Sequence, residues 1–497
     1  MTVSPVRRTR REAPSLWRRL LWIALFLVVL LGVAAVAAVA VALDRVGRTP
    51  REWAPYLEHR SFHHNAVISD GAELVAEWLR YADGLPHGGL DPSAWAGALV
   101  GRASVAREPA SVSQHLLVGS AGRLREAVSG AHAGDVIELL PGTYRMDDPP
   151  LYFDAHGSAA APIVVRASRL GDVTIEANTQ EAFKVRAPYW TFENLQMRGV
   201  CGDDSYCEHA FHVVGAAEHI VIRNNRLTDF NAQIKINAED GRNPDAGLIE
   251  FNTFSDTRPR KTENPVTPID LDTASGWHVA GNLITDFIKG AGNGTSYGAF
   301  AKAAGDHTVF ERNVVLCEQR LNGYVGARIG LSFGGGGSPG SIRRDGGTSG
   351  HEQTASVMRD NLIAFCSDDG IYLNRAAESV IDHNTLIDTA GVDVRFPESS
   401  AEIVDNIVDG AIRERDGGSL QAAGNIGSPL LGLFVGWHPA RGLFNDPARL
   451  DLTWRSAPAA QPARPGGTDL CGVARGALTP PGAFADFVPC LHGAASP

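Results

Sequence analysis

The longest feature of the hydrophobic pattern is an uninterrupted apolar run near the start of the chain. It covers 24 residues, from Leu20 to Leu43, with the sequence LLWIALFLVVLLGVAAVAAVAVAL. A run of this length can cross the hydrocarbon core of a bilayer as a helix, and it is longer than the core of a signal peptide. We therefore expect a transmembrane anchor at 20–43, with a cleaved signal sequence as the alternative.

Charge on the two sides of this run predicts its orientation. Residues 1–20 carry a net charge of +5 from six arginines and Glu12, and few basic residues follow the run. Basic residues flank the cytoplasmic side of membrane helices. We expect residues 1–19 to be a cytoplasmic tail. The protein would be single-pass in the inner (cytoplasmic) membrane, with its body in the periplasm or outside.

Residues 44–114 form a juxtamembrane segment that is partly helical by pattern. Within DGAELVAEWLRYADGL, the apolar residues Leu74, Val75, Trp78 and Leu79 recur at helical spacing. The segment carries no recognisable chemical motif.

From residue 115 to residue 428 the pattern changes to short alternating strands, and one phrase repeats. An asparagine precedes an apolar strand at intervals of 22 to 31 residues, with one interval of 48 that contains a Gly-rich insertion near 333–350. This period is typical of a parallel β-helix, in which stacked asparagines hydrogen-bond along a ladder. We expect an all-β, right-handed parallel β-helix. The repeated residues are Asn194, Asn225, Asn252, Asn282, Asn313, Asn361, Asn384 and Asn406.

Each coil carries a second strand, and its alternation places two columns of side chains on the outer surface. Neighbours in a column should lie roughly 5 Å apart. The first column is His212, Lys235, Asp270, Phe300, Gly330, Tyr372 and Asp393. The second column is Val214, Asn237, Asp272, Lys302, Ser332, Asn374 and Arg395.

Both ends of the predicted β-helix have candidate covers. RLREAVSGAHAGDVIELLPGTY reads as a short amphipathic helix and a strand, and the helix would protect the first coil. Residues 429–497, Pro- and Gly-rich, would cap the far end. Six cysteines are compatible with three structural disulfides in an oxidising compartment, grouped as Cys201 with Cys207, Cys317 with Cys366, and Cys471 with Cys490.

Net charge limits the class of partner. The whole chain has a formal charge of −11, so the part after residue 20 carries −16. A body this acidic is not expected to bind nucleic acid. It would also repel an anionic polysaccharide unless a cation or a local basic patch lay between them.

The opening coils resemble a known group of enzymes. LREAVSGAHAGDVIELLPGTY followed by APIVVRASRLGDVTIEA is similar to the start of the chondroitinase B and alginate lyase group, within the pectate-lyase-like β-helix superfamily. The resemblance covers roughly residues 115–200. It implies a calcium site formed by Asn237, Asp270 and Asp272. The catalytic lysine of that group has no match, because Trp277 stands at its position, and Lys302 could replace only the assisting arginine.

The residues themselves allow two interpretations of this cluster. Asp270 and Asp272 project from one face of one strand, where two carboxylates and the Asn237 carbonyl could bind a hard cation such as Ca²⁺. Alternatively, Lys235 and Lys302 on adjacent coils form ordinary cross-strand ion pairs with the two aspartates.

A site of this composition fits β-elimination on a uronate-containing polysaccharide. That reaction needs positive charge against the sugar carboxylate and a base for the neighbouring proton. The candidate bases are Lys302, Lys235 and, less favoured, Tyr372. The candidate substrate-binding residues are Arg395, Asn374, Asp393 and Phe300. We therefore expect a membrane-anchored polysaccharide lyase.

Two other functions stay open. A glycoside hydrolase would use paired acids, either Asp270 with Asp272 or Asp368 with Asp369. Alternatively, the β-helix is a non-catalytic envelope protein that binds glycans or proteins along its polar face, because a fold does not dictate catalysis.

Overall fold

A computed structural model describes residues 16–61, 64–88, 100–101, 111–335, 338–462 and 467–492. The chain divides into two compact units, residues 1–48 and 49–497. Most of the predicted cytoplasmic tail and part of the predicted juxtamembrane segment lie outside the described residues.

The first unit consists of helix α1, Leu16–Val46. It contains the apolar stretch Leu20–Leu43, with a mean hydropathy of 3.0, and none of this stretch is buried against the protein. The helix is long and apolar enough to cross a membrane, and a signal sequence would have the same properties.

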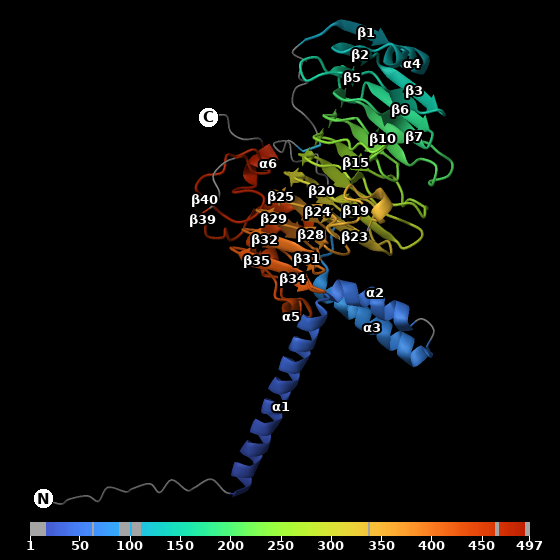
Figure 1. Cartoon of the computed structure of the whole chain (residues 1–497). Coiled ribbons are helices and arrows are strands. Elements are labelled where there is room, and N and C mark those ends of the chain that lie inside the picture. Colours follow the sequence, from blue (N-terminus) through green and yellow to red (C-terminus); the bar gives the residue numbers. More distant parts are fainter. Residues whose placement is uncertain are drawn as a thin grey trace, which may run out of the picture. The chain divides into compact units, whose positions relative to one another are not determined.

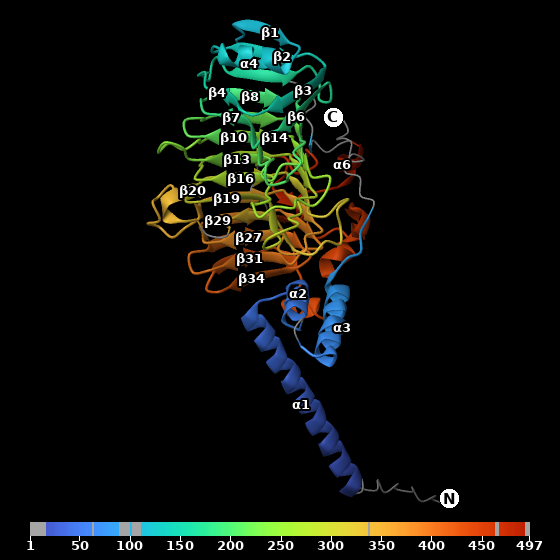
Figure 2. The same ribbon diagram turned by 90° about the vertical axis from the view of Figure 1, so that its right-hand side faces the viewer.

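The second unit is a parallel β-helix with a helical hairpin at its start. Figures 1 and 2 show short strands stacked in coils from β1 at one end to β34 and β35 at the other. In the described residues the coils form parallel sheets of twelve, ten and eleven strands. All three grow in sequence order, because each coil adds one strand to each sheet. The predicted fold class is confirmed.

The twelve-strand sheet contains β1 Gln114–Val118, β2 Asp135–Leu139, β5 Ile163–Ala167, β8 Trp190–Glu193, β11 Val221–Arg223, β14 Leu248–Glu250, β17 His278–Ala280, β21 Val309–Glu311, β25 Val357–Arg359, β29 Ser379–Asp382, β32 Ser400–Val404 and β35 Ser419–Ala423. The ten-strand sheet contains β4 Leu151–Phe153, β7 Glu181–Val185, β10 His209–Val214, β13 Ile234–Asn237, β16 Ile269–Asp272, β19 Thr295–Lys302, β23 Ala327–Phe333, β27 Ile371–Asn374, β31 Gly391–Arg395 and β34 Ala411–Arg415. The eleven-strand sheet contains β3 Gly142–Asp147, β6 Val173–Asn178, β9 Gln196–Gly199, β12 Arg226–Thr228, β15 Thr253–Ser255, β18 Leu283–Thr285, β22 Val314–Leu316, β26 Leu362–Ala364, β30 Thr385–Ile387, β33 Ile407–Val408 and β36 Ile426–Gly427.

The main hydrophobic core runs along the inside of the coils. Alternate residues of each strand point inward, as Ile269 and Leu271 do on β16, and both are completely buried. Burying one such side chain contributes about 1.5–3 kcal/mol. Helix α4, Ala121–Ser129, covers the first coil with Leu124 and Val128, as the sequence predicted.

The asparagine ladder runs through the corner between the first and third sheets. Asn225 donates from Nδ2 to Asn252 Oδ1 at 3.0 Å, and the same contact repeats coil by coil to Asn406 and then Asn425. Two details differ from the sequence pattern. Asn194 is not part of the ladder. It takes the left-handed backbone conformation, with φ 63°, one residue before the ladder position, and Leu195 occupies that position. Asn425 also belongs to the ladder, although only a short strand, β36, follows it.

The C-terminal segment packs along the side of the β-helix. It contains α5 Leu430–Leu433, β37 Phe444–Asp446, β38 Asp451–Trp454, β39 Gln461–Pro462, β40 Leu478–Thr479 and α6 Val488–His492. Its apolar residues, such as Phe444 and Phe484, form a second core with outward-facing residues of the eleven-strand sheet, such as Leu362 and Ile407. Most of the segment therefore covers a side of the coils, whereas the sequence pattern placed it over the end.

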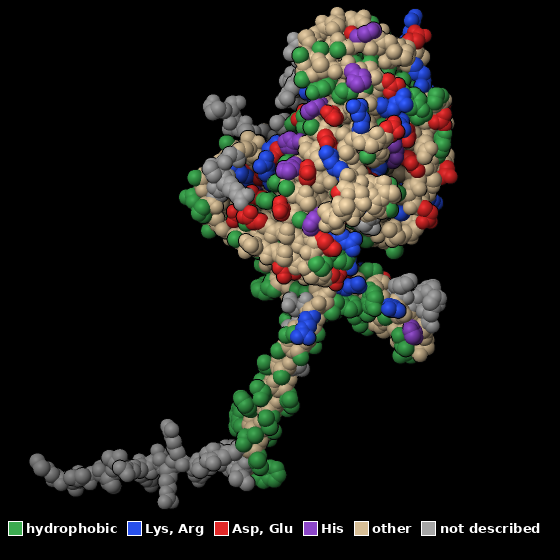
Figure 3. Space-filling model, in the orientation of Figure 1, with side chains coloured by type: hydrophobic (Ala, Val, Ile, Leu, Met, Phe, Trp, Pro, Cys, Tyr) green, Lys and Arg blue, Asp and Glu red, His purple; other side chains and the backbone are tan. Residues whose placement is uncertain are grey.

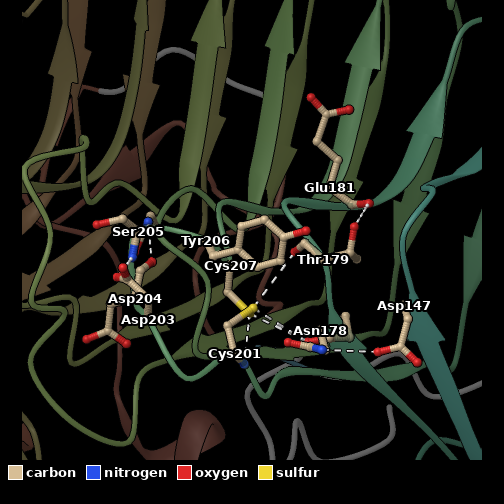
Figure 4. Close-up of a disulfide and its surroundings, with 12 residues drawn as sticks. Asp147, Asn178, Thr179, Glu181, Cys201, Asp203, Asp204, Ser205, Tyr206 and Cys207 are labelled. Carbon is tan, nitrogen blue, oxygen red and sulfur yellow. Dashed lines mark hydrogen bonds between the residues drawn. A yellow bond between two sulfur atoms is a disulfide. The ribbon is translucent and has the colours of Figure 1, made fainter.

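The three disulfides join the cysteines that the sequence grouped: Cys201–Cys207, Cys317–Cys366 and Cys471–Cys490. Figure 4 shows the first, which joins cysteines six positions apart and closes a loop that contains Tyr206.

Helices α2, Pro50–Ser61, and α3, Ala66–Asp83, form an antiparallel hairpin in the second unit. Asn65 caps α3, because its side chain accepts a hydrogen bond from the Ile68 amide. The remaining short elements are a three-strand sheet, β20 Gly305–Asp306, β24 Gln353–Thr354 and β28 Ala376–Ala377, and the 3₁₀ turns η2 Gly340–Ile342, η3 Pro439–Leu443 and η4 Pro447–Arg449.

Candidate functional site

The candidate site lies on the outer face of the ten-strand sheet, where the predicted columns are largely reproduced. Lys235 pairs with Asp270, Asp270 with Phe300, and Asp272 with Lys302 in adjacent strands. Beyond the insertion Tyr372 pairs with Asp393 and Asn374 with Arg395. Residues far apart in sequence therefore form one surface.

One register in the predicted columns is wrong by two residues. Phe300 pairs with Ser332, whereas the predicted columns placed Ser332 beside Lys302. The pairing of β19 with β23 instead sets Ala299 beside Leu331, which places Gly298 opposite Gly330. A shift of two residues keeps every side chain on its predicted face and changes only its neighbour. Ser332 therefore joins the first column, between Phe300 and Tyr372.

The central cluster consists of two carboxylates around one ammonium group. Lys235 Nζ donates to Asp270 Oδ1 at 2.9 Å and to Asp272 Oδ2 at 2.5 Å. Lys302 Nζ lies 3.7 Å from Asp272 Oδ1, which is buried and makes no hydrogen bond to the described residues. Both aspartates are buried. The two lysines thus differ: Lys235 is bonded to two carboxylates, and Lys302 only approaches one.

These contacts determine the charge state of Lys235. Burial alone would lower the pKa of Lys235, but the charges of Asp270 and Asp272 outweigh burial and raise it. Lys235 therefore stays protonated at neutral pH and is a poor base. Burial, and then the charge of Asp272, raise the pKa of Asp270, whereas Lys235 acts in the opposite direction.

The predicted calcium ligands already have partners. Asn237 Oδ1 accepts a hydrogen bond from His212 Nε2 at 2.7 Å, and Asp270 and Asp272 share Lys235. The Lys235 ammonium group, with one positive charge, lies between the two carboxylates where a calcium ion would bind. The arrangement therefore does not fit a cation while Lys235 holds this position, and calcium binding stays a prediction that requires Lys235 to move.

A pocket of about 560 Å³ opens beside this cluster. Its lining includes Lys235, Asn237 and Asp272 on one side, and residues 341–344 of the insertion on the other. The insertion is held by ion pairs, because Arg343 binds Glu352 at 2.7 Å and Arg344 binds Asp245 at 2.7 Å. In its described part, the Gly-rich insertion is thus held in place by these ion pairs.

Aromatic and amide side chains continue this face towards the C-terminal coils. Phe300 is only 3% exposed, and Lys302 Nζ lies 4.5 Å from the centre of its ring. The Tyr372 hydroxyl accepts hydrogen bonds from Asn374 Nδ2 at 3.1 Å and from Arg395 Nη1 at 3.3 Å. Burial raises the pKa of Tyr372, so this phenol is protonated at neutral pH.

A second charged cluster occupies the last coils of the same sheet. Asp393 is completely buried and pairs with Arg415 and Arg413. Arg413 also binds Asp369 at 2.8 Å and Glu52 of helix α2 at 3.1 Å. Because Asp393 and Asp369 are enclosed by arginines and by the helical hairpin, we leave both out of the proposed site.

Asp368 belongs to the same C-terminal cluster. Burial and the charge of Glu52 raise the pKa of Asp368 to about 7. This is the protonation range of a general acid, but Asp369, its partner in the predicted acid pair, is held by Arg413.

The sequence interpretation missed one group at the ladder corner. Asp382, His383 and Asp405 have ligand-capable atoms within 4.8 Å of one another. His383 and Asp405 occupy the left-handed positions immediately before Asn384 and Asn406. The sequence did contain a signal for this group. The residues immediately before the ladder asparagines stack on one another from coil to coil, and His383 and Asp405 are two of them.

Comparisons with known proteins support the fold. No family model matches the chain, and no curated protein sequence is detectably similar to it. Among solved structures, pectate lyase Pel9A shares 12% identity with a TM-score of 0.51, over 76% of this chain and 98% of that one. An alginate lyase from Paenibacillus sp. str. FPU-7 shares 14% identity with a TM-score of 0.37, over 63% of this chain and 95% of that one.

At these identities the likeness concerns the fold and not the chemistry. The similarity to pectate lyase Pel9A extends over nearly the whole length of that protein. The chain thus has the pectate-lyase-like parallel β-helix fold.

Proposed function

We propose that the protein is a membrane-anchored, extracytoplasmic polysaccharide lyase that cleaves uronate-containing glycans by β-elimination. The observation that carries the proposal is the pocket lined by Lys235 and Asp272 at the middle of the ten-strand sheet, with Lys302 paired to Asp272 on the next strand. Helix α1 supports the anchor, and three disulfides support an oxidising compartment.

Lys302 is the proposed base. It has no short ion pair in the described structure, since its Nζ lies 3.7 Å from Asp272. In its free-amine form Nζ would take the proton next to the sugar carboxylate. The bond to the leaving oxygen then breaks, the sugar becomes unsaturated, and the leaving oxygen takes a proton from solvent water or from the Lys302 ammonium that has just formed. A lysine acts as a base only in its free-amine form.

Positive charge must face the sugar carboxylate during this step. Arg344 of the insertion lines the pocket and has one carboxylate partner, Asp245. It is the proposed partner of the sugar carboxylate. Lys235 stays protonated and holds Asp272 in place beside Lys302. Arg395 continues the face along which further sugar units would bind, whereas Tyr372, Asn374 and Phe300 are buried within it.

The direct test is turnover of acidic polysaccharides by the purified protein. A lyase produces unsaturated uronate, which absorbs ultraviolet light, together with new reducing ends. Reducing ends without that absorbance would show hydrolysis by a carboxylate pair instead.

A non-catalytic glycan-binding function is the second candidate. It is favoured by one observation: Asp270 and Asp272 already share an ion-pair partner, Lys235, within the protein. Saturable binding of an acidic glycan, without turnover over a broad panel of polysaccharides, would establish this function and exclude the lyase.

A further inference from the structure

Helix α3 has an apolar face that no described part of the protein covers. Its inner face, with Ala76 and Leu79, packs against α2. The opposite side of the helix carries large apolar side chains, and Tyr81 and Leu74 on it are 87% and 69% exposed. Hydrophobic side chains are visible on this hairpin in Figure 3. We call this surface the α3 apolar face; it consists of Val67, Ile68, Leu74, Val75, Trp78 and Tyr81.

Such a face is unusual on a soluble surface. Large apolar residues that occur singly need no explanation, but a continuous stripe along one helix marks an interaction surface. The stripe runs the length of α3, since Val67, Leu74, Trp78 and Tyr81 recur at helical spacing. Further exposed apolar residues, Val435 and Trp437, follow α5.

The hairpin is firmly attached to the β-helix, so it cannot turn this face inward. Arg51 of α2 binds Asp388 at 2.8 Å and Asp83 at 2.8 Å. At the same end of α3, the Ala82 carbonyl lies 3.0 Å from His438 Nε2. These contacts are formed with the inner side of the hairpin and leave the α3 apolar face outside.

The chain itself indicates what covers the face. Only residues 44–49 separate the end of the apolar stretch at Leu43 from the start of α2 at Pro50. Six residues span at most about 20 Å when fully extended. If residues 20–43 cross a membrane, the hairpin must lie close to that membrane.

We propose that the α3 apolar face lies on the bilayer surface next to the anchor, with its side chains in the headgroup region. Trp78 and Tyr81 are residue types that favour this depth. An amphipathic helix at an interface buries its apolar side among the headgroups and keeps its charged side in water. The proposal rests on the proposed membrane location and is independent of lyase activity.

The charges on α3 define the kind of membrane contact. Asp70, Glu73 and Glu77 are exposed beside the apolar face, and Arg80 pairs with Glu58. With this acidic balance, attraction to anionic lipid does not drive binding. The contact is apolar, so it should form on zwitterionic lipid and survive high salt.

The test uses residues 49–497, which form a compact unit with their own cores and lack the anchor. This fragment should float with phosphatidylcholine vesicles. It should remain bound in about 1 M sodium chloride, where the Debye length is about 3 Å. The double variant Leu74→Glu/Trp78→Glu should reduce the bound fraction roughly tenfold or more, because charged groups replace buried apolar surface.

A matched control makes the same changes elsewhere. Leu117, on β1 in the first coil, and Leu478 are 63% and 68% exposed and belong to neither helix of the hairpin, so Leu117→Glu/Leu478→Glu should bind vesicles like the unsubstituted fragment. Circular dichroism and thermal unfolding should be the same for all three proteins. The proposal is overturned if the fragment does not float, if both double variants bind equally, or if the face forms a stable dimer that vesicles do not dissociate.

Discussion

The ten-strand sheet carries two charged clusters that differ in access. In the middle, Lys235 and Lys302 meet Asp270 and Asp272 beside a pocket of about 560 Å³. At the last coils, Arg413 and Arg415 enclose Asp369 and Asp393, and helix α2 adds Glu52. Both clusters use one sheet and the same types of residue.

The difference lies in what covers each cluster. The insertion leaves space beside the middle cluster, whereas the hairpin fills the space at the end. A charged cluster on a β-helix is therefore a candidate site only where a pocket gives a ligand access to it. A closed cluster of buried charges is better suited to favouring one folded arrangement of the chain than to binding or transforming a substrate.

The largest expected effect is on catalysis at the middle cluster. Lys302→Met removes the proposed base and should lower turnover by about 10²–10⁴-fold, the usual contribution of a general base. Lys261 is exposed and does not line the pocket, so Lys261→Met should retain turnover. Initial rates of unsaturated product formation measure both. Full activity of Lys302→Met would exclude this lysine, and loss of activity in Asp368→Asn alone would move the site to the end cluster.

Arg413→Met tests the closed cluster through stability. The substitution leaves Asp369, Asp393 and Glu52 with less positive charge in a buried place. Breaking a buried pair in this way costs about 3–5 kcal/mol. Denaturant unfolding would measure this loss, and Lys302→Met, at the more open cluster, should lose less than about 1 kcal/mol. Equal losses in the two variants would show that the clusters do not differ in burial energetics.

The end cluster should also make stability depend on pH. The pKa of Asp368 is about 7 in the folded protein, above the ordinary value of about 3.9 in the unfolded chain. Between these values the folded state holds a proton that the unfolded state has lost. Stability is therefore greatest below about pH 4 for this group and decreases as the pH rises to about 7.

Melting temperatures from pH 5 to pH 8 would measure this effect, which should amount to a few degrees. Asp368→Asn should flatten the profile, because the variant has no proton to lose. An unchanged slope in that variant would assign the pH dependence to other buried acids, such as Asp256, whose pKa burial raises to about 8.

The smallest expected effect concerns calcium. In Lys235→Met the carboxylates of Asp270 and Asp272 lose their shared ammonium group, and Ca²⁺ can take its place. Calcium at ten times its dissociation constant should stabilise that variant by about 1.4 kcal/mol and the unsubstituted protein by less. Thermal shifts with and without a chelator test this. A larger shift in the unsubstituted protein would mean that calcium displaces Lys235.

Much of the fold was predictable because it repeats. The ladder asparagines recur once per coil. Side chains alternate between the two faces of a strand, so the sequence of β16 alone was enough to place Ile269 and Leu271 inside. The disulfide groupings followed from two pairs of cysteines close in sequence, which left Cys317 and Cys366 for each other. The register of β19 with β23 was missed, because a shift of two residues leaves the hydrophobic pattern unchanged.

The candidate site was less predictable for a different reason. The sequence placed Asp270 between Lys235 and Phe300, and the register confirms this placement. It did not show that Lys235 would bind both carboxylates, since that depends on side-chain reach. The closure of Asp393 depends on Glu52, more than 300 residues away in the chain, and no local pattern reports such a contact.

The regular stacking of coils also sets the distance between the pocket and the last coil of the β-helix. Five strand-to-strand steps separate β16, which carries Asp270 and Asp272, from β34, which helix α2 contacts through Arg413 and Glu52. At about 4.8 Å per step, the pocket stands roughly 24 Å from that last coil. If α3 rests on lipid, the β-helix acts as a spacer. The pocket would then face polymers that lie about this distance from the membrane. Inserting or deleting whole coils would change the distance by one strand spacing per coil.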